Sequence, residues 1–235
     1  IHFFTQGVMP SVDRVSGKVL LAAADALAFN PDGHGGTLRA LAGSGVLSTL
    51  RSQGIEHLSY FQVDNPLVRA LDPIFLGLHI GDSVSSGEVT SKAVAKRSAD
   101  EKVGVFGVQD GHLTVLEYSD LDPEMCEATD GHGKLKFRAG NMAVHAFGLD
   151  FLDRLTKGKG LPFHRAIKKV PFFDESTGTV QTPPAPNAVK YETFIFDALP
   201  LATRPLVVEA DRAEEFAPIK TVSYTHLRAH ETRTH

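Results

Sequence analysis

A glycine-rich loop at residues 30–36 is the first segment whose residue types could do chemistry. Three glycines fall within four positions, at Gly33, Gly35 and Gly36, and residues able to start a helix follow from Thr37. Glycine allows positive φ and close backbone approach, and the free N–H groups at a helix start attract anions. The loop predicts either a phosphate-binding site or an ordinary turn before a helix, and the loop alone leaves both interpretations open.

Asp64 is the second candidate. It follows residues 55–63, an aromatic and β-branched segment typical of a strand, and Pro66 ends that segment. A carboxylate at the carboxyl end of a parallel strand lies where open α/β sheets bind ligands. There it could hold Mg²⁺, which takes one or two carboxylates and shares phosphate oxygens. The alternative is an aspartate that merely starts a turn.

The elements that must position these residues follow from periodicity. Leucines at helical spacing predict a helix over residues 37–53, with Gly43 and Gly45 breaking it into two pieces. Helix followed by strand indicates an α/β sheet with parallel members. Residues 74–80 predict another buried strand, and residues 206–210 predict the last one.

Antiparallel structure is predicted in the middle of the chain. Residues 103–108 and 113–118 flank Asp110-Gly111, a strong hairpin signal. Asp-Gly-His occurs here and twice elsewhere, so its first copy in the glycine loop carries little weight by itself.

The second half of the chain adds one strand and two helices to these expectations. We expect a strand at residues 143–147, a helix at 150–156, and a second helix whose apolar stripe runs over residues 191–199.

Composition sets broad limits on the class of protein. The chain has 235 residues, a net charge of −4 and a single cysteine, Cys126. These values give no basic surface for nucleic acid and no disulfide framework. No stretch approaches the roughly 20 apolar residues that span a bilayer. We expect a cytoplasmic protein without nucleic-acid or membrane partners.

Ten segments, taken in order, resemble the UDP-sugar pyrophosphorylases, and within them the eukaryotic-type UDP-N-acetylhexosamine pyrophosphorylases and their bacterial relatives. No single segment is specific, but ten in the same order leave little room for chance. The resemblance covers essentially residues 1–220. The segments are residues 3–10, 31–36, 63–65, 96–98, 103–105, 116–119, 139–141, 168–171, 190–197 and 216–220.

The resemblance implies an α/β fold of the Rossmann-like, GT-A-like nucleotidyltransferase type: a mixed sheet flanked by helices, with an antiparallel hairpin region. It implies a uridylyltransferase with Mg²⁺ as cofactor, which converts UTP and a sugar 1-phosphate into a UDP-sugar and pyrophosphate. N-acetylglucosamine 1-phosphate is the leading acceptor. The alternatives are a glucose-specific or broad-specificity UDP-sugar pyrophosphorylase, and a non-catalytic UDP-sugar binding fragment. The oligomeric state is not indicated.

The resemblance also assigns residues on the nucleotide side. Gln6 and Gly33 would contact the uracil, with His34 nearby, and Asp64 would bind Mg²⁺ between the nucleotide and the sugar phosphate.

On the sugar side, Gly104, Glu117 and Asn141 would hold the sugar hydroxyls and the N-acetyl group. Tyr118 would pack beside them, and Asn65 is assigned to substrate binding. Two lysines, Lys190 and Lys220, would neutralise phosphate charge as the catalytic residues.

Departures from the family pattern lead to further expectations. The family's glycine-rich triphosphate loop, with a catalytic lysine, lies upstream of Gln6 in relatives. We therefore expect residues 1–220 to be the central part of the catalytic domain, residues 221–235 to be a non-native tail, and the chain as printed to turn over poorly. His34 resembles the glucose-specific and broad-specificity branches, whereas Gly35-Gly36 resembles the N-acetylhexosamine branch.

Overall fold

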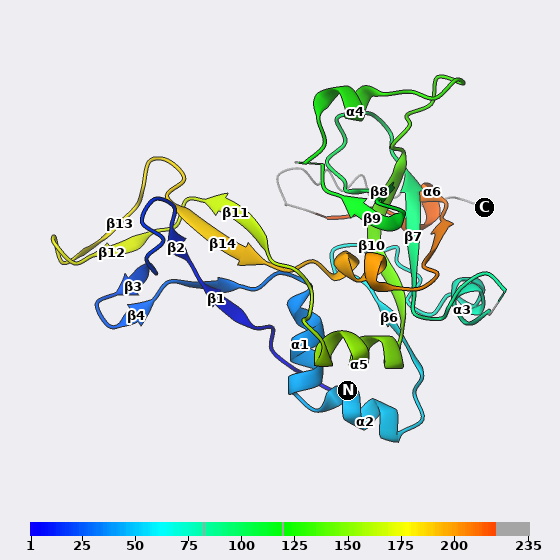
Figure 1. The fold of residues 1–235 in the computed structure, drawn as a ribbon, viewed down its shortest axis with the longest axis horizontal. Coiled ribbons are helices and arrows are strands. Elements are labelled where there is room, and N and C mark those ends of the chain that lie inside the picture. The colour runs from blue at the N-terminus through cyan, green and yellow to red at the C-terminus, as the bar shows by residue number, and fades with distance from the viewer. Residues whose placement is uncertain (82, 119, 220–235) are drawn as a thin grey trace, which may run out of the picture. The chain divides into compact units, whose positions relative to one another are not determined.

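The computed structural model describes residues 1–81, 83–118 and 120–219. The chain divides into two compact units, and each unit draws on two stretches of sequence (Figure 1). Unit 1 comprises Ile1–Glu56 and Leu149–Leu201, and unit 2 comprises His57–Gly148 and the chain from Ala202 onward. Segments far apart in sequence therefore meet within each unit.

Unit 1 combines short strands with a group of helices. Its strands are β1 (Val8–Pro10), β2 (Val12–Asp13), β3 (Leu21–Ala23), β4 (Ala26–Leu27), β5 (Phe29–Pro31), β11 (His164–Lys168), β12 (Phe172–Asp174), β13 (Thr179–Gln181) and β14 (Ala188–Glu192). Its helices are α1 (Gly36–Gly43), α2 (Val46–Ser52), α5 (Leu149–Lys157) and the 3₁₀ helix η1 (Ile195–Leu201).

The strands of unit 1 form small antiparallel sheets. The largest has the order β11-β14-β2, and β1–β5, β3–β4 and β12–β13 are two-stranded pairs. A small core of Leu20, Ala28, Val170 and Ala188, with Phe172 packed against it, joins these pieces.

The helices of unit 1 match the expected interruption. α1 ends at Gly43, and Gly45, at φ +77°, caps the start of α2. A positive φ costs little only for glycine, so the predicted break is confirmed. α5 is also confirmed, because it spans the expected residues 150–156.

Unit 2 is built on one larger sheet. Its strands are β6 (His57–Tyr60), β7 (Val89–Ala95), β8 (Val105–Gln109), β9 (His112–Leu116), β10 (Ala139–Gly148) and β15 (Leu206–Glu209). Its helices are α3 (Pro73–Ile80), α4 (Pro123–Glu127) and α6 (Arg212–Glu215).

The sheet of unit 2 is mixed, as expected. Its order is β15-β7-β10-β8-β9, with β6 also paired to β10; strands β6 to β10 are labelled in Figure 1. β15 runs parallel to β7, and the other pairs are antiparallel. β8 and β9 form the predicted hairpin, with Asp110 at φ +52° and Gly111 at φ +81° in its turn. The fold is α/β, with a mixed sheet, helices and an antiparallel hairpin region.

One expectation about Asp64 is wrong. The preceding strand, β6, pairs antiparallel with β10 rather than with a parallel neighbour, and it ends at Tyr60, four residues before Asp64. The ten-residue strand β10 is long enough to pair with β7 along one edge and with both β6 and β8 along the other. β10 thus separates β6 from β7 although both run in the same direction.

The expected strand at residues 74–80 is also wrong, because this segment is helix α3. The Asp72 carboxylate accepts hydrogen bonds from the N–H groups of Ile74 and Phe75, at 3.0 and 3.2 Å, and Pro73 occupies the first turn. An aspartate cap followed by proline is a helix-start signal, and a short apolar run alone does not distinguish strand from helix.

The expected helix over residues 191–199 is only partly present. Tyr191 and Glu192 belong to β14, which pairs with β11. A 3₁₀ helix, η1, begins at Ile195 and contains Pro200. Strand pairing has overridden the helical spacing of the apolar residues at the start of this segment.

In the described part of the chain, no helix has both the length and the apolar character needed to cross a bilayer.

The packing of α3 on the sheet gives a direct test of this corrected assignment. Phe75 is 2% exposed and packs with Val94, Met142, Val144 and Ala146. Phe75→Ala should lower the free energy of unfolding by about 3–5 kcal/mol, measured by urea unfolding followed by circular dichroism. Its neighbour Ile74 is 75% exposed, so Ile74→Ala should change that free energy by less than about 0.5 kcal/mol. Equal costs at the two positions would contradict the assignment.

Candidate functional site

The glycine loop of unit 1 is clamped against Thr193, between β14 and η1. The Asp32 carbonyl accepts hydrogen bonds from the Thr193 N–H at 2.7 Å and from its hydroxyl at 3.0 Å, and the Gly35 N–H donates to the Thr193 carbonyl at 2.8 Å. Gly33 has φ +83°, and a Cβ added there would lie 2.6 Å from the Thr193 nitrogen. The glycine is therefore needed for backbone conformation and for close approach.

The other two glycines of the loop are equally confined. A Cβ at Gly35 would lie 2.8 Å from the Phe194 nitrogen, and one at Gly36 would collide with the Asp32 carboxylate. A side chain is therefore excluded at both positions.

The two residues assigned to uracil by resemblance lie together in unit 1. The Gln6 side-chain amide donates to the Gly33 carbonyl at 2.6 Å. The pair joins the segment before β1 to the glycine loop, although 27 residues separate them in sequence.

His34 is held as a neutral imidazole. Its Nδ1 accepts a hydrogen bond from the Ile195 N–H at 3.1 Å, and its ring stacks on Phe194 with centroids 5.2 Å apart. Burial, and then the charge of His164, lower the pKa of His34 from 6.5 to about 4. Because Nδ1 accepts, Nε2 carries the hydrogen, so at neutral pH His34 presents a hydrogen-bond donor.

A second histidine completes this aromatic group and was not singled out from the sequence. The ring of His164 lies 4.5 Å from that of Phe194, and its Nε2 lies 2.8 Å from an oxygen of the Asp197 carboxylate. Burial raises the pKa of the Asp197 carboxyl despite the opposing effect of His164. The resemblance included residues 190–197 but not His164. The two meet because β11 pairs with β14, and no signal in the sequence predicts that pairing.

Asp32 also went unrecognised in the sequence. It is 7% exposed, and its Oδ1 has no hydrogen-bond partner among the residues that the structure describes. The carboxylate lies against Gly36, the first residue of α1, where its negative charge is favoured by the helix dipole. The N–H groups of Gly36, Thr37 and Leu38 are bonded to backbone carbonyls of residues 33–35. These groups at the start of α1 are already used, so the structure disfavours the phosphate interpretation of this loop.

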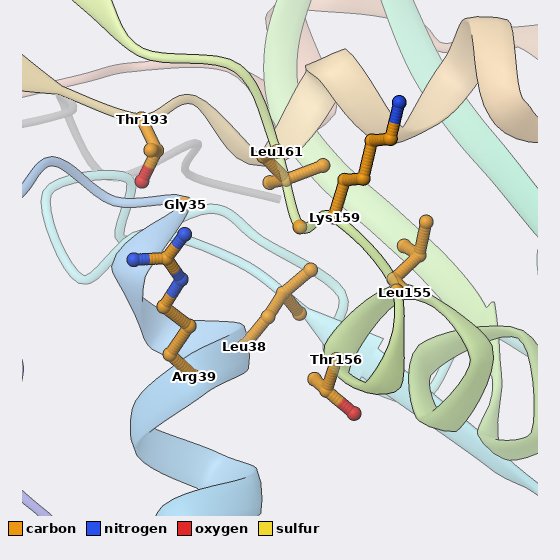
Figure 2. Close-up of a pocket in the computed structure, with 10 residues that line it drawn as sticks. Gly35, Leu38, Arg39, Leu155, Thr156, Lys159, Leu161 and Thr193 are labelled. Carbon is orange, nitrogen blue, oxygen red and sulfur yellow. The ribbon is translucent and has the colours of Figure 1, made fainter.

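A small pocket beside the loop is too small for a nucleotide. Figure 2 shows Leu38 of α1, Leu155 of α5 and Leu161 around it, with Arg39 and Lys159 at its edge. Its volume is about 50 Å³, whereas ligand pockets usually reach about 300–1,000 Å³. The pocket therefore reflects imperfect packing between α1 and α5.

The structure describes only one of the two lysines assigned to catalysis. Lys190 is half-buried in β14, opposite Ala166 of β11. Lys220 lies outside the described residues, and its assignment stays a prediction.

In unit 2, Asp64 and Asn65 are tied to the segment that follows α6. The buried Asn65 side chain donates to the Glu215 carbonyl at 2.8 Å and accepts from the Ala217 N–H at 3.1 Å. The Asp64 carbonyl accepts from the Ile219 N–H at 2.8 Å. These contacts give Asn65 a positioning role, and its assignment to substrate binding stays a prediction.

Asp64 and Asn141 line one pocket of unit 2. This pocket has a volume of about 120 Å³, and Glu101, Lys102 and Arg212 are among its other lining residues. This volume is also below the usual range of about 300–1,000 Å³ for ligand pockets, so the pocket could hold only part of a UDP-sugar. The residues assigned to the metal and to the sugar are thus brought together by β6, β10 and α6.

Gly104, Glu117 and Asn141 also converge. The Asn141 N–H donates to the Gly104 carbonyl at 2.7 Å, and a Cβ at Gly104 would lie 3.1 Å from Glu117 Oε1. β10 is irregular between Asn141 and His145, and Ala143 there has φ +55°. The Asn141 side chain accepts from the Ala143 N–H at 3.0 Å. This irregularity fixes the orientation of Asn141.

Tyr118 follows Glu117 directly and is 45% exposed. Its assignment as a packing residue beside the sugar stays a prediction.

The donor set of this pocket suits a hard cation. Among the described residues, no group of three or more His, Cys, Asp or Glu side chains could hold a metal ion. Two carboxylates line the pocket, Asp64 and Glu101, and Glu101 pairs with Arg212. Asp64, with the amide side chains of Gln62 and Asn141 nearby, therefore matches the sparse protein ligation of Mg²⁺, which relies on water and phosphate oxygens for its other positions.

Comparison with solved structures defines the class of protein. The chain is similar to the crystal structure of uridine diphosphate N-acetylglucosamine pyrophosphorylase from Trypanosoma brucei in complex with inhibitor, with TM-score 0.80 and 26% identity over 94% of this chain and 44% of that one. UDP-glucose phosphorylase from the same organism gives TM-score 0.73 at 21% identity, over 92% and 44% of the two chains, and shows the fold alone. The fold is the nucleotidyltransferase fold of the UDP-sugar pyrophosphorylases.

Residues 1–231 match the family described as UDPGP, UTP–glucose-1-phosphate uridylyltransferase. The chain belongs to this family. It is 38% identical to UDP-N-acetylglucosamine pyrophosphorylase of Saccharomyces cerevisiae, over 94% of the chain and 46% of that protein. The chain spans about half the length of the curated relatives it matches.

Two effects would destabilise an alanine at position 33, the positive φ and the collision with Thr193, and a second glycine allows them to be measured separately. Gly45 has φ +77°, and no atom of the described residues lies within 4 Å of an added Cβ. Gly45→Ala therefore tests conformation alone and should cost about 1–2 kcal/mol. Gly33→Ala adds a collision with Thr193 and should cost about 1–3 kcal/mol more. Thermal unfolding of both variants measures the difference, and an equal loss would show that Thr193 does not confine the loop.

The lowered pKa of His34 has a defined effect on stability. Between pH 6.5 and about 4, His34 binds a proton in the unfolded chain but not in the folded chain. The contribution of the neutral imidazole to the stability of the folded chain is therefore complete above pH 6.5 and is lost as the pH falls toward 4. At pH 5 this group should make the chain about 2 kcal/mol less stable than at pH 7.

His34→Asn should therefore flatten the acid dependence of unfolding relative to the wild type, with the other histidines unchanged in both proteins. NMR titration of the His34 ring should give an inflection near pH 4, and an inflection near 6.5 would contradict the burial argument.

Proposed function

We propose that the protein carrying this chain is a UTP:sugar-1-phosphate uridylyltransferase that makes UDP-N-acetylglucosamine and pyrophosphate from UTP and N-acetylglucosamine 1-phosphate. The observation that carries the proposal is the convergence of Asp64, Asn141, Gly104 and Glu117 within unit 2. The names of the S. cerevisiae and T. brucei relatives support the same substrate. A cytoplasmic location is part of this proposal.

In the proposed reaction, a phosphate oxygen of the sugar 1-phosphate attacks the α-phosphorus of UTP. The new P–O bond forms as the bond to pyrophosphate breaks, and pyrophosphate leaves with the electron pair. Such transfers need positioning and charge neutralisation rather than covalent help from the protein. Mg²⁺ neutralises phosphate charge when bound, and Asp64 would hold it. Lys190 and Lys220 would carry further positive charge.

Base recognition is assigned to the glycine loop. The Gln6 amide donates to the Gly33 carbonyl, and the second N–H and the oxygen of this amide are the groups we expect to meet a uracil edge. The N–H groups at the start of α1 are bonded to backbone carbonyls of the loop, which supports a role for this loop with the neutral base rather than with the triphosphate. His34, a neutral donor beside Phe194, is the residue we expect to influence substrate choice.

The sugar would be held by a few fixed polar groups. Glu117 accepts hydrogen bonds from hydroxyls, and Asn141 can both donate and accept. A Cβ at position 104 would lie 3.1 Å from Glu117 Oε1, so a glycine there avoids crowding this carboxylate.

The proposal is tested on the protein extended to the length of its relatives. Pyrophosphate release should require both UTP and a sugar 1-phosphate, with N-acetylglucosamine 1-phosphate preferred over glucose 1-phosphate. A preference for glucose 1-phosphate would identify the broad-specificity or glucose-specific alternative. Binding of UDP-sugar without turnover would identify a binding protein and overturn the proposal, and so would an absence of UTP-dependent turnover across the panel.

A matched pair of variants examines the metal role. Asp64→Asn should lower kcat at least about 100-fold, because it removes the proposed Mg²⁺ ligand while preserving size. Asp110→Asn lies in the exposed β8–β9 turn at φ +52°, a conformation that asparagine adopts readily, and should retain full activity. Similar losses in both would argue against a specific role for Asp64.

A further inference from the structure

A buried cation lies beneath the Asp64 segment and belongs to none of the roles described above. The Lys92 side chain, on β7, is 2% exposed. Its Nζ donates to Asp72 Oδ2 at 2.6 Å and to Glu215 Oε2, and it also lies 5.2 Å from the centre of the Phe75 ring. Lysine is rarely buried this completely unless it is paired.

Each carboxylate paired with Lys92 holds a different part of unit 2. Asp72 uses its other oxygen, Oδ1, to cap α3. Burial raises the pKa of the Asp72 carboxyl, but its hydrogen bonds to Lys92, Phe75 and Ile74 bring the net pKa below the ordinary value. Asp72 is therefore ionised when it faces Lys92.

Glu215 leads directly to Asp64. It is the last residue of α6, and its carbonyl accepts the Asn65 amide. From Glu215 the chain continues beside residues 64–65, with Ala217 bonded to the Asn65 side chain and Ile219 bonded to the Asp64 carbonyl. Hydrogen bonds and the short covalent segments between them thus connect the Lys92 ammonium to the backbone of Asp64.

A buried ion cluster of this kind contributes little net stability, because desolvation offsets much of the attraction. Its directional bonds can nevertheless fix the position of one segment relative to another. Here the fixed segment is residues 215–219, which contains Phe216 and Pro218 of the Asp64 pocket.

We propose that Lys92, through Glu215 and Asn65, is a positioning residue that sets the place of Asp64 for divalent-cation binding. This inference rests on the proposed function, in which Asp64 is the metal ligand. Groups that orient metal ligands from behind typically affect metal affinity by about 10–100-fold. Loss of Lys92 should therefore weaken metal binding while Asp64 itself is unchanged.

The first test uses neighbouring glutamates of α6. Glu215→Gln removes the charge that faces Lys92, whereas Glu214→Gln alters an exposed residue that pairs with Arg69. Mn²⁺ alone is titrated into each full-length chain and free Mn²⁺ is followed by electron paramagnetic resonance. We expect Glu215→Gln and Lys92→Met to weaken Mn²⁺ binding about tenfold and Glu214→Gln to leave it unchanged.

A second measurement tests whether residues 215–219 stay in place beside Asp64. Amide hydrogen exchange at Ala217 and Ile219 reports the two hydrogen bonds that hold residues 215–219 beside Asp64. Lys92→Met and Glu215→Gln should accelerate exchange at both amides, while exchange in the β8–β9 hairpin stays at the wild-type rate. Uniform acceleration throughout unit 2 would indicate general destabilisation and overturn the proposal.

A variant with no charge at the three positions keeps the proposal testable if Lys92→Met alone does not fold. Lys92→Met alone leaves two buried carboxylates facing each other, so the triple variant Asp72→Asn, Lys92→Met, Glu215→Gln removes all three charges at similar volume. A folded triple variant should still bind Mn²⁺ about tenfold more weakly. Wild-type affinity in that variant would overturn the inference.

The Asp64→Asn chain separates this inference from the proposed function. If Asp64→Asn abolishes Mn²⁺ binding and the Lys92 variants do not weaken it, the inference alone fails. If Asp64→Asn binds Mn²⁺ as the wild type does, the metal role of Asp64 fails and the inference fails with it.

Discussion

The pairing of β10 is the constraint on which unit 2 depends. This strand bonds to β7 along one edge and to both β6 and β8 along the other, so one segment fixes the direction of three others. A regular strand in this place would alternate its side chains strictly between two faces. The irregularity between Asn141 and His145 breaks that alternation, and it lets the end of β10 near Gly104 present Asn141 while the other end stays buried against β6.

Thr193 has the equivalent importance in unit 1, on a smaller scale. Its backbone and hydroxyl bond to Asp32 and its carbonyl accepts from Gly35, so one residue holds both ends of the glycine loop. The following residues, Phe194 and Ile195, then hold the His34 ring by stacking and by a backbone hydrogen bond. The geometry of the loop is thus determined by a segment about 160 residues later in the chain.

Local signals in the sequence were sufficient where structure is decided locally. Asp110-Gly111 predicted its hairpin, and Gly45 predicted the break between α1 and α2, because both positions need positive φ. Residues 74–80 were misassigned because their apolar run fits a strand or a buried helix, although the Asp72 cap was visible in the sequence. The pairing of Tyr191 with Arg165 overrode a helical pattern, and no local signal reports such a register.

For the site, resemblance named Gln6, Gly33 and Asn141, whereas Asp32, His164 and Lys92 act through contacts that only the folded chain reveals.

The crowding around the glycine loop also limits how this protein could diverge. Positions 33, 35 and 36 meet Thr193, Phe194 and Asp32 so closely that no side chain fits there, which leaves position 34 as the place in residues 33–36 where a side chain can vary. Side-chain variation within residues 33–36 is therefore confined to a single codon. Phe194 and Phe196 pack on the His34 ring, and Phe196 is 5% exposed, so variation at position 34 has to preserve this aromatic packing if the chain is to stay folded.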